Sequence, residues 1–72
     1  MIKVVKTKNS EFVENAGHFK ITLENNDKLL LTRIEYGNLK QVENHEGLLF
    51  ESTSGNFYKP VVNDGNIDFK YA

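Results

Sequence analysis

Clusters of turn-forming residues recur about every ten residues along this chain, and they constrain its fold more than any other feature. Each cluster separates two short apolar-rich runs, a pattern typical of short strands joined by tight turns. The clusters are Asn25-Asn26-Asp27, Gly37-Asn38, Asn44-His45-Glu46-Gly47, Ser54-Gly55-Asn56 and Asn63-Asp64-Gly65-Asn66. We therefore predict an all-β fold, a small antiparallel meander of six or seven short strands that closes into a barrel or sandwich.

The 72 residues are enough for a single small β domain, 1–72, of SH3-like or OB-like size. Such a domain has a thin core, and the absence of Cys excludes disulfides and thiolate zinc sites. Stability must therefore come from packing or from a partner chain. We see no signal peptide and no run near the roughly 20 apolar residues of a membrane span, so we expect a soluble, cytoplasmic protein.

Alternation of apolar and polar residues predicts strands at 2–8, 18–24, 28–36, 48–52, 57–62 and 67–71. A two-residue loop at Asn25-Asn26 would place Ile21 opposite Leu30 and Phe19 opposite Thr32, on one core-facing side. From this register we predict a core of Phe19, Ile21, Leu30, Ile34, Phe50, Ile67 and Phe69.

Two segments admit both helix and strand. Ser10 is a candidate cap for a short helix near residues 10–16 that ends at Gly17, with a loop or a further strand as the alternative. Gly37-Asn38 suits a hairpin turn that would set Glu35 opposite Lys40. The alternative there is a helix that starts at Leu39, so residues 39–46 are helix or strand and loop.

The last predicted hairpin has the strongest turn signal in the chain, Asp64-Gly65. Pro60 lies in the strand that precedes it. Because proline has no N–H to donate to a ladder, we expect this strand to lie at a sheet edge or to carry a bulge.

Adjacent apolar residues on several strands point to a second apolar face, because neighbouring residues on a strand face opposite sides. A contiguous apolar surface usually marks an interaction site. We therefore expect a non-catalytic module that binds a protein partner or forms a homodimer. The candidate contact residues are Leu29, Leu31, Leu49 and Val62.

Aromatic residues next to lysines suggest a second hypothesis, the binding of single-stranded nucleic acid on a barrel face by base stacking. The net charge of −1 weighs against it, because nucleic-acid binding usually needs a basic domain. The candidate residues for this alternative are Tyr36, Tyr58, Tyr71, Lys20, Lys59 and Lys70.

The chain has no motif that indicates catalysis, and we do not expect an enzyme, a cofactor or a small-molecule substrate. There is no phosphate-binding glycine loop and no dinucleotide fingerprint. His45 stands between Glu43 and Glu46, but close-spaced ligands in one turn are a weak metal signal, so we expect a solvated turn and no metal site. His18 opens a strand, where we expect it to be partly buried.

Overall fold

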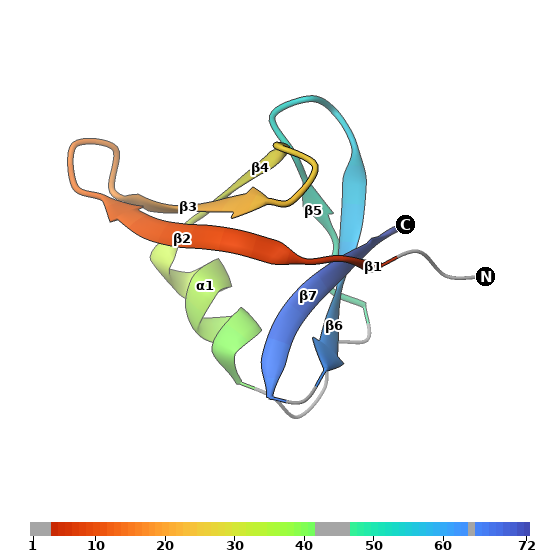
Figure 1. Cartoon of the computed structure of the whole chain (residues 1–72). Coiled ribbons are helices and arrows are strands. Elements are labelled where there is room, and N and C mark those ends of the chain that lie inside the picture. The colour runs from red at the N-terminus through yellow and green to blue at the C-terminus, as the bar shows by residue number, and fades with distance from the viewer. Residues whose placement is uncertain (1–3, 42–46, 64) are drawn as a thin grey trace.

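The computed structural model describes residues 4–41, 47–63 and 65–72, in which strands predominate (Figure 1). The prediction of an all-β, antiparallel fold is confirmed. Residues 2–3 of the first predicted strand and the 42–46 part of the ambiguous segment lie outside the described residues. The elements are β1 (Val4–Val5), β2 (Thr7–Val13), β3 (His18–Leu23), β4 (Lys28–Leu31), α1 (Arg33–Lys40), β5 (Phe50–Glu51), β6 (Phe57–Asn63) and β7 (Asn66–Tyr71).

The strands form two antiparallel sheets, ordered β1-β7-β6-β5 and β2-β3-β4. Only Lys6 separates β1 from β2, so one stretch of chain serves both sheets. On the far side, an isolated bridge between Leu29 and Ser52 links β4 to the end of β5. The sheets do not close into a barrel, because β2 and β7 are not paired with each other. Figure 1 shows α1 on this open side, below β2 and beside β7.

The turn between β3 and β4 contains three residues, 24–26, rather than the predicted two. The amide of Leu23 donates to the carbonyl of Asp27 at 2.8 Å and closes the loop. Asn26 takes a φ of 69°, the left-handed conformation that three-residue hairpins need at their last position. Asparagine tolerates this conformation better than most residues, which is why the sequence supports this turn.

The longer turn shifts the strand register by one residue. The predicted pairing of Ile21 with Leu30 was wrong, because Ile21 faces Leu29 and Phe19 faces Leu31. A one-residue shift moves every side chain to the other face of the sheet. Leu29 and Leu31 are consequently buried, whereas Leu30, predicted to be in the core, is 46% exposed.

α1 forms where the sequence predicted a strand and a Gly37-Asn38 turn. Thr32, predicted to face Phe19, caps this helix instead. Its hydroxyl accepts from the Glu35 amide at 3.2 Å, and the Glu35 carboxylate accepts from the Thr32 amide at 2.9 Å. This reciprocal capping box satisfies two amides at the start of the helix and favours helix over strand from Arg33 onward.

The helical period also changes which residues are buried. Ile34 was predicted to be in the core but is 77% exposed, whereas Leu39 is buried. Glu35 and Lys40 are helical, so they do not form the predicted cross-strand pair. The alternative helix starting at Leu39 was also wrong, because α1 ends at Lys40.

The helix predicted near residues 10–16 is not formed. β2 continues to Val13, so the further strand that we considered is correct for the first part of this segment. A turn follows, in which the Gly17 amide donates to the Val13 carbonyl at 2.8 Å and Gly17 has a φ of 68°. Phe12 and Val13 pair with Phe19 and His18 across β2 and β3, which stabilises the strand more than a two-turn helix would be stabilised.

β6 and β7 form the predicted last hairpin, with Asn63 opposite Asn66. On the side of β6 that faces β7, Pro60 pairs with Phe69. β6 is not an edge strand, because β5 lies on its other side, but β5 pairs only with Phe57 and Tyr58. Pro60 therefore lies past the residues that pair with β5. On that side its missing N–H removes no hydrogen bond between described strands.

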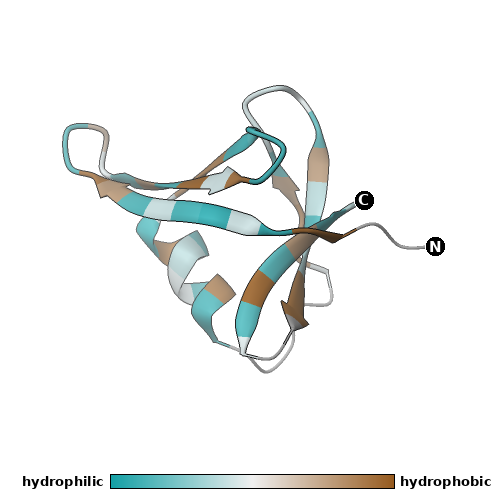
Figure 2. Cartoon of the chain, viewed as in Figure 1, coloured by the Kyte–Doolittle hydropathy of each residue, from teal (hydrophilic) through white to brown (hydrophobic). Residues whose placement is uncertain are grey.

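The core lies between the sheets. Figure 2 shows hydrophobic and hydrophilic positions alternating along β7, and Phe69 of this strand is fully buried. Of the other predicted core residues, Phe50 and Phe69 are buried, whereas Phe19 and Ile67 are partly buried. Within the described residues, no helix has the length and apolar character needed to cross a membrane. The core consists of Val5, Ile21, Leu23, Leu29, Leu31, Leu39, Phe50, Tyr58 and Phe69.

Candidate functional site

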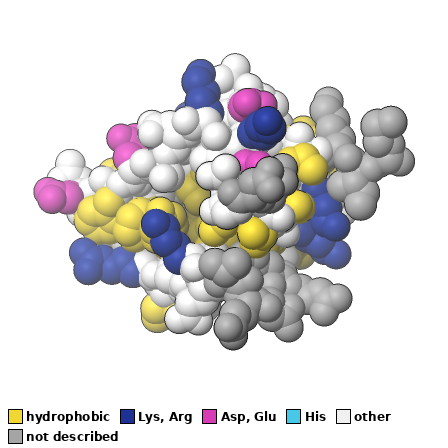
Figure 3. Space-filling model, turned by 60° about the horizontal axis from the view of Figure 1, so that its bottom comes forward, with side chains coloured by type: hydrophobic (Ala, Val, Ile, Leu, Met, Phe, Trp, Pro, Cys, Tyr) yellow, Lys and Arg dark blue, Asp and Glu magenta, His cyan; other side chains and the backbone are white. Residues whose placement is uncertain are grey.

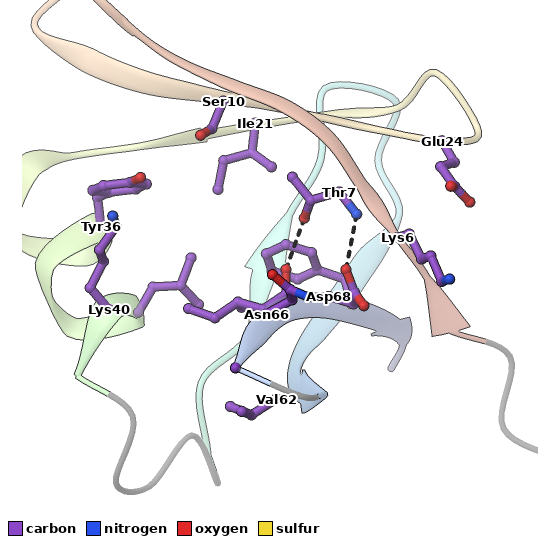
Figure 4. Close-up of a pocket in the computed structure, with 14 residues that line it drawn as sticks. Lys6, Thr7, Ser10, Ile21, Glu24, Tyr36, Lys40, Val62, Asn66 and Asp68 are labelled. Atoms are coloured by element: carbon purple, nitrogen blue, oxygen red, sulfur yellow. Dashed lines mark hydrogen bonds between the residues drawn. The ribbon is translucent and has the colours of Figure 1, made fainter.

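A cleft of about 730 Å³ opens where the two sheets separate (Figure 4). One wall consists of β2 and β3, the opposite wall of β7, and α1 lies across one end. Ser10 and Ile21 pair across β2 and β3, and both line the cleft. The helix contributes Tyr36, Leu39 and Lys40, and β7 contributes residues 66–69. The cleft is therefore lined by both apolar and hydrogen-bonding side chains.

Thr7 holds β2 against β7 at one end of the cleft. Its amide donates to Oδ1 of Asp68 at 3.2 Å, and its hydroxyl donates to the carbonyl of Ile67 at 3.0 Å. Figure 4 shows both hydrogen bonds crossing between the strands. Asp68 is buried and Thr7 is partly buried, so this link is partly shielded from water. Beyond it the two strands diverge toward the helix and leave the cleft between them.

Both strands that border the cleft have an open edge. β2 is the outer strand of its sheet and pairs only with β3 in the described residues. β7 pairs with β1 only through Phe69 and Lys70, so no described strand forms a ladder with residues 66–68 on that side, although the Ile67 carbonyl there accepts from the Thr7 hydroxyl. Open edges carry backbone N–H and C=O groups that another strand can pair with.

A second hollow, of about 440 Å³, adjoins the cleft at the helix. It is lined by Phe12, Phe19, Arg33, Tyr36, Gly37 and Lys40, so Tyr36 and Lys40 belong to both cavities. We call the cleft and this hollow together the groove. Figure 3 shows hydrophobic side chains gathered on this side of the molecule, with Lys and Arg side chains beside them.

Three aromatic rings form the floor of the hollow. The rings of Phe19 and Tyr36 are stacked, with centroids 3.9 Å apart and an interplanar angle of 7°. Phe12 packs on Phe19 at 5.0 Å in a tilted arrangement. This cluster attaches α1 to the sheet of β2 to β4, and all three residues are only partly buried.

Two cations lie over these rings. The guanidinium carbon of Arg33 is 4.8 Å from the Phe12 centroid, and Nζ of Lys40 is 5.3 Å from the Tyr36 centroid. In the described residues neither cation has a carboxylate partner. The ion pair that the described residues form joins Lys20 and Glu11, which do not line the hollow. The hollow therefore carries two positive charges that no described acidic group neutralises.

A buried carboxylate, Asp27, organises the opposite end of the molecule. Its Oδ2 accepts from the hydroxyl of Tyr58 at 2.7 Å and from the Asn56 amide group at 3.2 Å. Its Oδ1 accepts from the hydroxyl of Ser54 and the amide of Lys28, both at 2.9 Å. Because Ser54 and Asn56 precede β6 and Asp27 precedes β4, this network joins the turn before β4 to the turn before β6.

The network shifts the pKa values of both its central groups. Burial opposes ionisation of Asp27, but hydrogen bonds from Ser52, Tyr58, Ser54 and Asn56 outweigh it and hold the pKa of this carboxyl well below its usual range. Burial, together with the hydrogen bond to anionic Asp27, raises the pKa of Tyr58 to about 12. The pair is thus an ionised carboxylate and a neutral phenol at neutral pH, which suits a structural role.

The four predicted contact residues do not form one surface. Leu29 and Leu31 are 0% and 1% exposed, so they belong to the core of this chain. The one-residue register shift explains this error. Leu49 and Val62 are 51% and 41% exposed, and Val62 lines the cleft.

The six candidates for nucleic-acid binding are not gathered on one surface either. Tyr58 is fully buried, because it faces inward opposite Tyr71. Lys59 and Lys70 face each other on the other side of that sheet. Lys20 pairs with Glu11 on the outer face of β3.

Of these six residues, Tyr36 alone lies in the groove. Sequence reasoning did not identify Phe12, Arg33 or Lys40 as site residues, and it missed the two cations because it did not place a helix at Arg33. The Thr32 and Glu35 spacing of a capping box was the signal that could have located that helix.

The described residues contain no group of three or more His, Asp or Glu that could hold a metal ion. His18 is partly buried at the start of β3, as predicted. The predicted solvated turn around His45 lies outside the described residues. Neither protein-family models, curated proteins nor solved structures gave a match to this chain.

Proposed function

We propose that this chain is a non-catalytic binding module that takes an extended segment of a partner protein into the cleft between β2 and β7. The observation that carries the proposal is the pair of open strand edges on either side of the cleft. Extended peptides bind such edges by adding a strand, so that main-chain hydrogen bonds provide affinity. Alternate side chains of the added strand then enter the cleft and provide specificity.

The lining of the cleft supports binding by an extended chain. Val62 and Ile67 offer apolar contacts for inward-facing side chains, and Ser10 and Asn66 offer polar ones. Thr7 and Asp68 are already engaged in holding β2 to β7, so they serve the shape of the site. Some residues thus hold the strands in place and others remain available for contact. This is typical of a preformed recognition site, which binds without large rearrangement.

A matched pair of substitutions on β2 tests the proposal. Ser10 lines the cleft, whereas its neighbour Asn9 lies on the opposite face of the same strand, and both are exposed. Ser10→Tyr should fill the cleft and weaken the binding of peptides selected from a displayed random library by at least about tenfold, the equivalent of about 1.4 kcal/mol. Asn9→Tyr makes the same change in side chain and should leave binding intact.

Backbone amides provide the second measurement. On addition of a selected peptide, amides of β2 and of the open stretch of β7 should become protected from hydrogen exchange, while those of β3 and β6 should not change. Protection elsewhere, or equal effects of Ser10→Tyr and Asn9→Tyr, would contradict a strand added at this edge. Protection that rises with the concentration of the chain alone would identify a second copy as the occupant, which is the homodimer that the sequence suggested.

A further inference from the structure

We infer that the partner segment is acidic and apolar, with one bulky apolar side chain seated in the hollow of Phe12, Phe19 and Tyr36, and carboxylates on either side of it. This inference rests on the proposed function, because it names the chemistry of the segment that the groove accepts. Tyr36 and Lys40 line both the cleft and the hollow, so the two cavities are adjacent and an extended segment that passes these side chains can reach both.

Charge complementarity is the first argument. Arg33 and Lys40 flank the hollow, and the acidic residue of the helix, Glu35, directs its carboxylate to the amide of Thr32 and forms no ion pair with either cation. The rest of the cleft lining carries one cation, Lys6, and two acidic residues, Glu24 and Asp68, so it has a small net negative charge. Positive charge is therefore concentrated at the hollow. An arginine or lysine over a ring keeps N–H donors for a carboxylate, and such pairs steer association and fix register.

Ring geometry is the second argument, and it separates a peptide from a nucleic acid. One face of Tyr36 is stacked on Phe19, Lys40 also lies over the Tyr36 ring, and Arg33 lies over Phe12. A base stacks on an exposed ring face, so it would have to displace these contacts. An apolar side chain needs only the ring edges and the aliphatic stems of the two cations.

Sequences selected from a displayed library of random peptides of about ten residues test the inference. We expect enriched peptides to combine Asp or Glu with Phe, Trp, Leu or Ile. Their affinity should fall about threefold in Arg33→Gln and in Lys40→Gln, as is typical of exposed ion pairs, and about tenfold in the double variant. Lys59→Gln removes the same charge from the outer face of β6 and should have no effect.

The outcomes distinguish the two proposals. Peptides that Ser10→Tyr blocks, but that lack acidic residues and tolerate Arg33→Gln and Lys40→Gln, would overturn this inference and keep the groove. Failure to select any peptide would overturn both. Binding of a single-stranded oligothymidine that depends on Arg33 and Lys40, with no peptide selected, would instead identify the hollow as a nucleic-acid surface. Because these cations are exposed, their glutamine variants should keep the wild-type amide spectrum.

Discussion

The hydroxyl of Tyr58 donates a 2.7 Å hydrogen bond to Oδ2 of Asp27, and both side chains are buried. Tyr58 comes from β6, and Asp27 closes the turn before β4, so this bond joins the two sheets. Asn25 donates to the same hydroxyl at 3.1 Å and to that of Tyr71 at 2.9 Å. The small core is thus supplemented by a polar network whose buried members are all hydrogen-bonded.

Tyr58→Phe should lower the free energy of unfolding by about 1.5–3 kcal/mol, the range for hydrogen bonds to charged groups, because it leaves a buried carboxylate one donor short. Tyr71→Phe is the matched control. Its hydroxyl is on an exposed residue, so the change should stay within about 0.5 kcal/mol. Urea unfolding of both variants measures the difference, and equal losses would show that the bond to Asp27 is not special.

Acid should destabilise the protein through Asp27. The pKa of this carboxyl is lowered in the fold, whereas in the unfolded chain it is about 3.9. Its contribution is therefore present above about pH 4 and is lost as the pH falls toward the folded pKa. Asp27→Asn should be less stable at neutral pH and should lose less stability in acid. Urea midpoints measured from neutral to acid pH check this, and parallel curves for the two proteins would contradict it.

Alkali should act through Tyr58. Its pKa is raised to about 12 from an unfolded value of about 10, so its contribution is fully present below about pH 10 and is lost as the pH rises through about 12. Ultraviolet absorbance should show one tyrosinate that forms late in an alkaline titration. Tyr58→Phe should remove that late step, whereas Tyr71→Phe should retain it. A late step that survives Tyr58→Phe would assign it to another residue.

The register of β4 predicts losses of stability of very different size for two neighbouring leucines. Leu29 is fully buried, so Leu29→Ala should cost about 2–5 kcal/mol, because it leaves a cavity in a thin core. Leu30 is 46% exposed, so Leu30→Ala should cost far less. Thermal unfolding ranks the two variants. A larger loss for Leu30→Ala would contradict the pairing of Ile21 with Leu29 and favour the register of a two-residue turn.

The start of α1 depends on its capping box. Thr32→Ala removes the hydroxyl that accepts from the Glu35 amide and should cost about 1 kcal/mol. Thr32→Ser keeps the hydroxyl and should restore most of that loss. Urea unfolding and the helical part of the circular dichroism spectrum follow the effect. Identical stability of the alanine and serine variants would show that the cap does not hold the helix.

Local patterns in the sequence were sufficient where structure is local. The alternation of Phe19, Ile21 and Leu23 predicts β3, and Asp64-Gly65 predicts the hairpin of β6 and β7. The helix was missed although its signal was also local. The apolar residues before Gly37-Asn38 continued the pattern of the preceding strand, and that pattern concealed the cap at Thr32.

By itself, the sequence determined that the chain forms short antiparallel strands, and where most of the turns between them lie. It did not determine how many residues each turn uses, and one extra residue after Leu23 exchanged the inner and outer faces of β4. The groove was decided by tertiary structure alone. Thr7 and Asp68 are 61 positions apart, and only folding brings their strands together at one end and lets them diverge at the other. Periodicity describes neighbours along a chain, whereas a binding site depends on segments that meet only in space.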